Sequence, residues 1–588
     1  MRTEVKKSLL LSGIFLLLFI VFNILISNAL FIVKIEITKY NMIVSLLLCI
    51  FILLWVLKKF NLLSLKKFYN IIIALILPIA LIVGSLFVNS KIMDFTFDGN
   101  TYHKATIGLL KEGWNPLYET AAEFDNGREN KIYIENSSSE LWTELWTDCY
   151  ARATHVYQAN AYALTNNIES GKSINTLSII ALFLIIFSYL ALRFKKIVFP
   201  FIFALCCITY SVVSAQYLTV YIDFFVYIYL LLLLFSFFVI EFRRNEKELN
   251  FGLLIYSLAL LMLINIKFNS FAYAGIFCLG YYFYYIYKLI KKREKEQKFF
   301  VKFTTISAIN VIVGVFIIGL SVYPKNFIEY GNPFYPLYGE NKVDIITENQ
   351  PAEFENLPAI EKYTRAMFSK TENMAKASGR ETEYKIPFAV SKDEMNYIRM
   401  TDTRISGNGV LFSGIFIISL ILLILTSIKM YHYNKKIFIM ASIPLAITFL
   451  MIFLLSESWW ARYFPQTYFI VLIVIFYLYL LKGKFYKVLL VVLFILVLAN
   501  NGITLFKATE YSYDQNKLAN NEFRLLEENV DPNNQFIVLQ APVFIGSLYD
   551  IYDNLPNYKF QLVPPEEKID LSNTLMNGLV LWKWQNNE

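Results

Sequence analysis

Long apolar runs recur along most of this chain and are separated by shorter polar connections. About 20 residues of helix cross the hydrocarbon core of a bilayer, so runs of ~18 or more apolar residues indicate membrane-spanning helices. The pattern predicts an all-α polytopic membrane protein with about thirteen spans. We place these spans at 8–33, 42–57, 69–89, 176–192, 197–215, 220–242, 251–266, 271–287, 303–323, 410–428, 437–455, 465–481 and 488–506.

The charges between the apolar runs predict the orientation in the membrane. The connections on one side hold 26 of the 54 lysines and arginines, whereas the short connections on the other side hold four: Lys34, Lys39, Lys267 and Arg462. Lysine and arginine concentrate in cytoplasmic loops, which places the first set inside the cell. An odd number of spans in the inner or plasma membrane then gives a cytoplasmic N-terminus and an outer C-terminus.

Three large polar regions fall on the predicted outer side, at 90–175, 324–409 and 507–588. In the third, "NEFRLLEENV" has the apolar spacing of a helix and "NQFIVLQAPVFIG" is typical of a strand and a turn. We expect a small outer α/β domain there, although a solvated tail is the alternative. The chain then divides into two N-terminal helices (1–68), a membrane core (69–506) and this domain.

Composition excludes several classes of protein. With 57% hydrophobic and 17% charged residues, a soluble chain of 588 residues would expose too much apolar surface. The net charge of +8 comes from clusters between the spans and does not indicate nucleic-acid binding. Four of the five cysteines lie in apolar runs, so no disulfide framework is expected. No P-loop or GxGxxG motif is present, and every predicted cytoplasmic connection is short.

The first candidate site is "KIMDFTFDGNTYHKATIGLLKEGWNPLY", residues 91–118, directly after the third span. Its apolar positions predict a short amphipathic helix on the membrane surface, which "GWNP" ends. Asp94 and Asp98 precede that helix. A partly desolvated carboxylate has a raised pKa and is a better general base. Asp98 capping the helix is the alternative, and the two carboxylates could also share a divalent cation.

Two charged side chains lie at the outer ends of later spans. Asp223, in "QYLTVYIDFF", falls in the first turn of the sixth span, where an ionisable residue indicates function unless it caps the helix or reaches the interface. Lys267, in "NIKFNS", opposes the positive-inside trend and is a candidate for binding an anion such as phosphate. A lysine reaching lipid headgroups is the alternative.

The connection "SESWWARYFPQ" places Arg462 beside Trp459, Trp460 and Tyr463. A guanidinium is a planar fork suited to phosphate oxygens. Aromatic rings could stack on sugars, although tryptophan and tyrosine also anchor proteins at the membrane interface. A second aromatic stretch, "YPKNFIEYGNPFYPLYGENKVDI", contains Tyr335 in an ordered, proline-rich loop.

The layout from about residue 69 onward resembles the GT-C superfamily, integral membrane glycosyltransferases that use lipid-linked sugars. The segments "DGNTYHKATIGLLKEGWNPLY", "NAYALTNNIESGKSIN", "NIKF", "YGNPFYPL" and "WWARYFPQ" resemble bacterial members. Two extra spans precede the first large loop. That loop has Asp-x-x-x-Asp in place of the adjacent acidic pair, which leaves the choice between Asp94 and Asp98 open.

The resemblance implies transfer of a hexose or pentose from a polyprenyl phosphate, such as undecaprenyl phosphate, to a cell-envelope glycan, a lipid or a protein. Asp98 would be the base and Arg462 or Lys267 would bind the donor phosphate. The residues expected to contact substrate are His103, Asp223, Trp459, Trp460, Tyr463 and Tyr335. The reaction inverts the anomeric centre and has no certain cofactor, although a divalent metal is possible.

Two other functions remain open. A polysaccharide polymerase or ligase would use a lipid-diphosphate donor and outer-loop arginines. Those available are Arg128, Arg152, Arg365, Arg380 and Arg404. A flippase or transporter is the second alternative. Transporters often carry internal repeats with matching broken spans, and we see no such repeat here.

Overall fold

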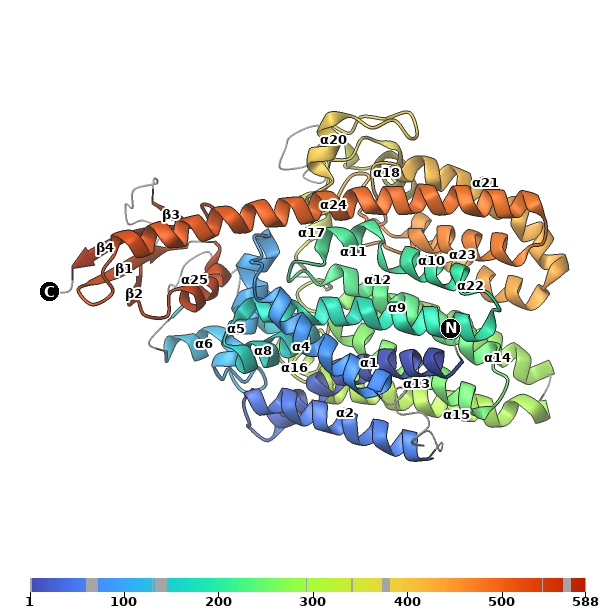
Figure 1. Cartoon of the computed structure of the whole chain (residues 1–588), viewed down its shortest axis with the longest axis horizontal. Coiled ribbons are helices and arrows are strands. Elements are labelled where there is room, and N and C mark those ends of the chain that lie inside the picture. The colour runs from blue at the N-terminus through green and yellow to red at the C-terminus, as the bar shows by residue number, and fades with distance from the viewer. Residues whose placement is uncertain are drawn as a thin grey trace.

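The predicted apolar runs form helices in the computed structural model (Figure 1). The structure describes residues 3–59, 72–128, 131–132, 145–291, 293–339, 342–372, 381–541, 543–563 and 573–586. Within those residues, ten helical segments are long and apolar enough to cross a membrane. They are α1 (Thr3–Ile32), α2 (Lys39–Lys59), η2 with α4 (Ile72–Asn89), η4 with α9 (Ile168–Arg193), α12 (Asp223–Glu241), α13 (Glu246–Ile266), α15 (Arg293–Val313) with η5 (Gly314–Ile318), α21 (Phe412–Tyr433), α22 (Lys435–Leu454) and α24 (Lys484–Asn529).

Three further helices occupy the remaining predicted spans. They are α10 (Val198–Ile208), α14 (Phe268–Lys291) and α23 (Thr467–Leu480). The predicted span 197–215 is two helices, because the chain leaves the helical conformation at Tyr210 before α11 (Ser211–Gln216) begins. The chain is therefore a polytopic α-helical membrane protein, as predicted, and the number of helices that cross stays a prediction.

The first helix, α1, lies inside the bundle and packs along α9. Its polar side chains bond to a neighbour within the apolar interior: Asn160 of α8 (Ala153–Thr165) donates to Ser27 Oγ at 2.9 Å. Small and polar residues hold membrane helices together in this way. The two N-terminal helices predicted as a separate unit at 1–68 thus include a helix of the core.

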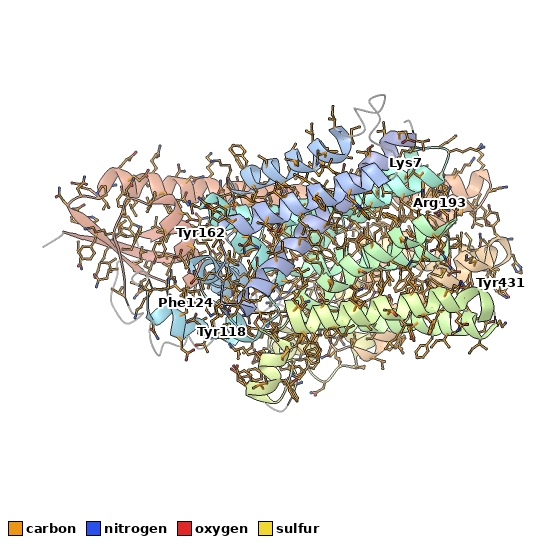
Figure 2. The ribbon with its side chains drawn as sticks, turned by 90° about the horizontal axis from the view of Figure 1, so that it is seen from below. Lys7, Tyr118, Phe124, Tyr162, Arg193 and Tyr431 are labelled. Atoms are coloured by element: carbon orange, nitrogen blue, oxygen red, sulfur yellow. The ribbon has the colours of Figure 1, made fainter. Side chains whose placement is uncertain are left out.

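Short helices form in both large polar regions between spans. Those of the first region are η3 (Gly99–His103), α5 (Lys104–Glu112), α6 (Ala121–Asn126) and α8. Those of the second are α16 (Tyr323–Tyr330), α17 (Ile345–Asn349), η6 (Ala352–Phe354), α18 (Ala359–Phe368) and α20 (Lys392–Tyr397). In Figure 2, Tyr118, Phe124 and Tyr162 of the first polar region lie toward the end of the molecule that carries the C-terminal sheet. Lys7, Arg193 and Tyr431 lie toward the opposite end.

The helix predicted at the membrane surface is present as α5, but its surroundings differ from the prediction. Residues 104–110 are buried in protein, between α8 and the C-terminal helix α25 (Leu548–Asn554). A Cβ on Gly108 would lie 2.0 Å from the Tyr549 ring, so the missing side chain lets that ring approach. The "GWNP" turn ends α5 as expected, with Gly113 in the left-handed conformation at φ +114.

The C-terminal part is a small α/β unit carried on one long helix. The 46 residues of α24 span about 69 Å at 1.5 Å per residue, more than twice the ~30 Å hydrocarbon core. The helix runs unbroken through the predicted boundary at 506/507. Beyond it, β1 (Gln535–Gln540) pairs in parallel with β2 (Phe560–Leu562) and antiparallel with β4 (Val580–Asn586), which pairs with β3 (Thr574–Leu575). This unit confirms the predicted small C-terminal sheet (Figure 1).

Candidate functional site

A cavity of about 850 Å³ lies where the two large polar regions meet the ends of the membrane helices. The cavity is lined by side chains from residues 95–103, 146–150, 221–223, 267, 345–349, 400–404 and 462–463, and by Tyr511, Phe544 and Leu579 from the C-terminal part of the chain. All these segments were predicted to lie on the same side of the membrane. Six of the ten predicted site residues line it: Asp98, His103, Asp223, Lys267, Arg462 and Tyr463.

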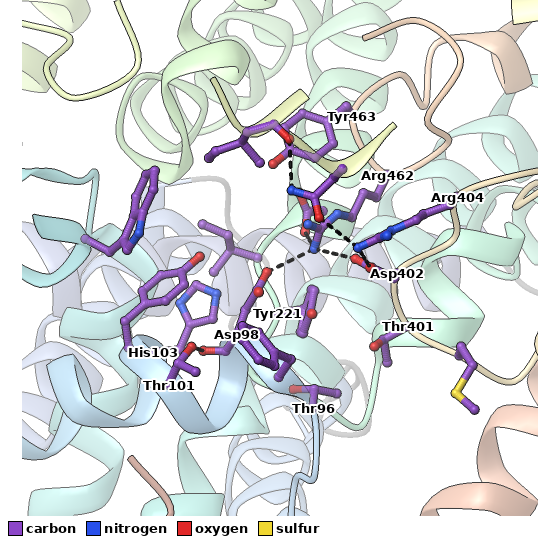
Figure 3. Close-up of a pocket in the computed structure, with 18 of the residues that line it drawn as sticks. Thr96, Asp98, Thr101, His103, Tyr221, Thr401, Asp402, Arg404, Arg462 and Tyr463 are labelled. Carbon is purple, nitrogen blue, oxygen red and sulfur yellow. Dashed lines mark hydrogen bonds and ion pairs between the residues drawn. The ribbon is translucent and has the colours of Figure 1, made fainter. Parts of the chain in front are cut away.

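A single π-helical turn, η3, positions the first two of these residues. Asp98 precedes the turn and His103 ends it, and a separation of five residues matches one i→i+5 hydrogen-bonded turn. Asp98 has helical φ and ψ and its side chain makes no capping hydrogen bond, so the capping alternative is wrong. Both side chains point into the cavity (Figure 3).

Arg462 is the centre of the charged groups in the cavity. Its Nη1 lies 3.0 Å from Asp98 Oδ2 and 3.3 Å from Asp402 Oδ1. The same atom lies 3.5 Å from Asp223 Oδ2. The guanidinium is 4.5 Å from the centroid of the Trp460 ring, a cation–π distance. One buried arginine therefore joins three carboxylates that come from three separate parts of the chain.

Lys267 lies in the turn between α13 and α14 and points into the protein. Its Nζ is 2.5 Å from Asp223 Oδ1 and 3.9 Å from the centroid of the Tyr463 ring. The lysine is 6% exposed, so the alternative of a side chain reaching lipid headgroups is wrong. Asp223 accepts a hydrogen bond from Lys267 and forms an ion pair with Arg462, which explains an acidic residue in the first turn of a membrane helix.

Asp402 and Arg404 belong to this charged group and were not among the predicted site residues. Arg404 lies 2.7 Å from Asp402 and donates to Asn349 Oδ1 at 3.0 Å. The stretch "TDTRISGNG", directly before the tenth span, could have indicated them, because it contains an aspartate and an arginine close to the end of a membrane helix. Arg404 also lies over the Trp460 ring, at 5.2 Å.

The five arginines of the polymerase alternative have different surroundings. Arg404 lines the cavity, and Arg380 lies outside the described residues. The other three lie elsewhere: Arg128 pairs with Asp125, Arg365 pairs with Glu361, and Arg152 donates to backbone carbonyls.

Three predicted aromatic residues do not line the cavity. Trp459 and Trp460 are 3% and 0% exposed and stack on each other at 5.2 Å, so they are interior residues instead of interface anchors. The guanidinium groups of the two cavity arginines, Arg404 and Arg462, both lie over the Trp460 ring. Tyr335 stacks on Tyr330 at 4.0 Å, away from the cavity.

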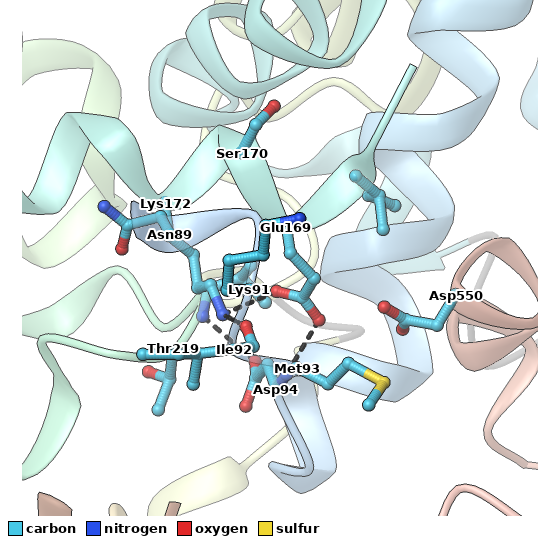
Figure 4. A network of polar contacts seen from close by, with 12 residues as sticks. Asn89, Lys91, Ile92, Met93, Asp94, Glu169, Ser170, Lys172, Thr219 and Asp550 are labelled. Atoms are coloured by element: carbon cyan, nitrogen blue, oxygen red, sulfur yellow. Dashed lines mark hydrogen bonds and ion pairs between the residues drawn. The ribbon is translucent and has the colours of Figure 1, made fainter. Parts of the chain in front are cut away.

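Asp94 is also outside the cavity, because its carboxylate holds the local backbone. It accepts hydrogen bonds from the amide of Thr96 at 2.9 Å, the hydroxyl of Thr96 at 2.9 Å and the amide of Val220 at 3.0 Å. Its own amide donates to Glu169 Oε1 at 2.7 Å (Figure 4). The geometry thus separates the two aspartates: Asp98 faces the cavity and Asp94 fixes the chain leading to it.

A second buried ionic network lies behind this chain segment. Lys104 Nζ is 2.7 Å from Glu169 Oε1 and 2.5 Å from Asp550 Oδ2, and Lys172 Nζ is 2.6 Å from Glu169 Oε2. All four side chains are almost completely buried. The network joins α5, η4 and α25, and so connects the C-terminal unit to the segment that carries Asp98.

Burial sets the protonation of the cavity groups that lie outside the spans. It raises the pKa of Asp98; the neighbouring carboxylates Asp402 and Asp223 raise it further, and Arg462 partly opposes them. Burial also lowers the pKa of His103 well below its usual value, and the nearby positive charges of Lys267 and Arg462 lower it further. A carboxylate with a raised pKa beside a cation is suited to accept a proton near neutral pH.

Within the described residues, no group of three histidine, cysteine, aspartate or glutamate side chains is placed to hold a metal ion. Asp94 and Asp98 point to different surroundings, so the shared cation considered from the sequence has no support in their geometry.

Comparison with known proteins does not identify this chain: no protein-family model, no curated protein and no solved structure matches it. The fold and site define its class, a polytopic α-helical membrane protein with a buried, charged cavity beside the ends of its helices.

Proposed function

We propose that this protein is a glycosyltransferase of the GT-C type, which moves a sugar from a polyprenyl phosphate to an acceptor hydroxyl on the outer face of the membrane. The observation that carries the proposal is the Asp98–Arg462 ion pair in the wall of the cavity, at 3.0 Å. This pair supports the proposal because a carboxylate and a cation lie within reach of one bound molecule, and the proposal assigns them the roles of base and phosphate-binding group.

The reaction needs a base at the acceptor hydroxyl, on one side of the anomeric carbon, and a cation at the phosphate, on the other side. The entering donor phosphate must therefore draw Arg462 away from its 3.0 Å contact with Asp98. Asp98 takes the proton of the acceptor hydroxyl as that oxygen forms its bond to the anomeric carbon. The bond from this carbon to the phosphate oxygen breaks with inversion, and the electron pair leaves with the lipid phosphate. Arg462 and Lys267 stabilise the negative charge on the departing phosphate. The products are the glycosylated acceptor and a free polyprenyl phosphate.

The size and lining of the cavity support a sugar ligand. A volume of about 850 Å³ is in the range of small-molecule sites. Aromatic side chains line it together with the charged ones, including Tyr102, Trp146, Tyr150 and Tyr221. Such rings can cover the apolar face of a sugar, while carboxylates and guanidinium groups bind its hydroxyls.

The charge balance of the cavity supports a singly charged phosphate diester over a diphosphate. The cations Lys267, Arg404 and Arg462 are each already paired with an aspartate. An entering phosphate therefore competes with carboxylates for the same donors, and one negative charge meets less repulsion than two.

The test is to incubate the purified full-length protein, in detergent, with a panel of polyprenyl-monophosphate sugars and acceptor glycans and to measure released polyprenyl phosphate. Lipid-diphosphate oligosaccharides form the matched second panel. Release from a monophosphate donor supports the proposal. Turnover of diphosphate donors alone would indicate a polymerase or ligase instead of the proposed transferase. Movement of the intact lipid-linked sugar across a vesicle membrane, without cleavage, would indicate a flippase.

A further inference from the structure

Two histidines form a buried pair in the wall of the cavity. His103 Nδ1 lies 2.7 Å from His155 Nε2, and the side chains are 1% and 2% exposed. His103 lines the cavity, whereas His155 of α8 lies behind it. At this distance one ring donates and the other accepts, so the tautomer of His155 decides which nitrogen of His103 carries its proton.

Both rings are neutral in these surroundings. Burial and the charge of Arg152 lower the pKa of His155 to about 3. Burial, His155, Lys267 and Arg462 lower the pKa of His103 well below its usual value. The titratable and charged groups around the pair are Asp98, Tyr102, Arg152, Tyr221, Lys267 and Arg462. Each ring therefore has one N–H group and one lone pair.

Arg152 favours one of the two tautomers of His155. Its guanidinium donates to the backbone carbonyls of Asp148 and Ser321. A guanidinium has only N–H donors, so it cannot accept a hydrogen bond from an N–H group of His155. Arg152 Nη1 and His155 Nδ1 both lack a hydrogen-bond partner among the described residues. A nearby positive charge favours a lone pair at Nδ1, which leaves the proton of His155 on Nε2. That N–H then donates to His103 Nδ1.

The consequence appears in the cavity. Because His103 Nδ1 accepts from His155, the proton of His103 is on Nε2, the nitrogen that is not used by the pair. Tyr221 lies near both His103 and Arg462. The centroid of the Tyr221 ring is 6.1 Å from the centroid of the His103 ring and 5.2 Å from the guanidinium of Arg462 (Figure 3).

We propose that His103 presents an uncharged Nε2–H donor to the phosphate of a prenyl phosphate, beside Arg462 and Lys267, and that His155 and Arg152 fix the tautomer that makes this possible. The identity of the ligand rests on the proposed function. A neutral donor adds a hydrogen bond to the developing phosphate charge without needing another carboxylate to balance it. His103 contacts the ligand, and His155 and Arg152 are positioning residues.

The tautomer is measurable without turnover, because the chain has only three histidines. We expect ¹⁵N NMR of histidine-labelled protein in nanodiscs at pH 7 to show neutral, Nε2-protonated rings for His103 and His155. Single glutamine variants assign the signals, and the exposed His432 serves as the internal control. An imidazolium or an Nδ1-protonated ring at position 103 would overturn the inference.

The ligand is tested with farnesyl phosphate as the probe and farnesol as its uncharged control. Farnesyl phosphate should shift the Nε2 signal of His103 and leave that of His432 unchanged, whereas farnesol should leave both unchanged. An equal response to the two compounds, or none to the phosphate, would exclude a phosphate at this nitrogen. These results do not depend on sugar transfer: a phosphate-specific shift without transferase activity would preserve the anion site and reject the proposed function.

Variants separate the tautomer from simple packing. A glutamine side chain in place of His155 retains an N–H donor toward His103, whereas leucine cannot donate. His155→Gln should therefore keep the farnesyl phosphate response, and His155→Leu should weaken binding at least tenfold. His103→Gln, which keeps a side-chain N–H, should likewise bind better than His103→Leu. Equal binding by the glutamine and leucine variants, with folding intact by size-exclusion chromatography, would overturn the proposal.

Discussion

The Nη1 atom of Arg462 lies 3.0 Å from Oδ2 of Asp98, although 364 residues separate the two in the chain. Asp98 directly precedes a π-helical turn after the third predicted span, and Arg462 lies in the short connection before α23. Because the arginine is 5% exposed and also contacts Asp402, its guanidinium is held in the wall of the cavity, next to the half-buried Asp98. The chemistry expected of the cavity depends on this contact.

Asp98→Asn should abolish sugar transfer and leave the fold intact. The amide cannot act as a base, and a positioned general base contributes ~10²- to 10⁴-fold to a rate. The measurement is release of polyprenyl phosphate by purified variant and wild type, alongside thermal unfolding.

Asp94→Asn is the matched comparison and should behave in the opposite way. Its carboxylate holds the Thr96 and Val220 amides, so the variant should lose about 1–3 kcal/mol of stability while the folded fraction still transfers sugar. If Asp98→Asn kept full activity while Asp94→Asn abolished it in folded protein, the roles of the two aspartates would be reversed.

Arg462→Gln should move the pH dependence of transfer to higher pH. Arg462 opposes the rise in the pKa of Asp98, so its removal raises that pKa further. The base must be deprotonated, and therefore the acidic limb of the kcat/KM profile should shift upward. Loss of the phosphate contact should also lower kcat ~10²- to 10³-fold at neutral pH.

Arg365→Gln is the control for that experiment, because Arg365 pairs with Glu361 outside the cavity. Its profile should match the wild type. An acidic limb that stays in place or moves to lower pH in Arg462→Gln would show that Asp98 is not the titrating base.

The sequence predicted the helices of the bundle and part of the site for a clear physical reason. Apolar runs of membrane length and charged residues at their ends are local signals, so α12 with Asp223 and the turn with Lys267 were found directly. Asp402 was missed because its role depends on contact with Arg462, 60 residues further along the chain. Local patterns do not carry such pairings.

The burial of α5 was wrongly predicted for a related reason. Its apolar positions specify a face that avoids water, and lipid and protein satisfy that requirement equally well. The partner is α25, which lies more than 400 residues away in the sequence. Together with α8, which packs on the helix from within the same polar region, this distant partner makes the surroundings of α5 protein instead of lipid.

Gly108→Ala should loosen the C-terminal unit from α5. The added Cβ would lie 2.0 Å from the Tyr549 ring, which must move. Overpacking of this kind typically costs about 1–3 kcal/mol, more than the ~1 kcal/mol that alanine gains over glycine within a helix. Faster limited proteolysis of the C-terminal unit by trypsin is the expected result.

Gly84→Ala is the matched control, because nothing lies within 4 Å of a Cβ at that helical position. It should cleave at the wild-type rate. If Gly108→Ala and Gly84→Ala were cleaved at the same rate, the close packing of Tyr549 on α5 would be rejected.

Lys104→Met should destabilise the protein strongly, and more so at neutral than at acidic pH. The lysine is fully buried between Glu169 and Asp550, and breaking a buried ion pair typically costs about 3–5 kcal/mol. Burial already raises the pKa of Asp550, and loss of Lys104 raises it further. The folded variant then binds a proton more tightly than the unfolded chain, so its stability recovers as the pH falls toward 5.

Lys111→Met is the control, because Lys111 is on the same helix but pairs with the partly exposed Glu112. This variant should melt within about a degree or two of the wild type at every pH. Thermal unfolding of the three proteins between pH 5 and 8 decides the matter, and a Lys104→Met variant as stable as Lys111→Met would mean that the network does not hold the C-terminal unit in place.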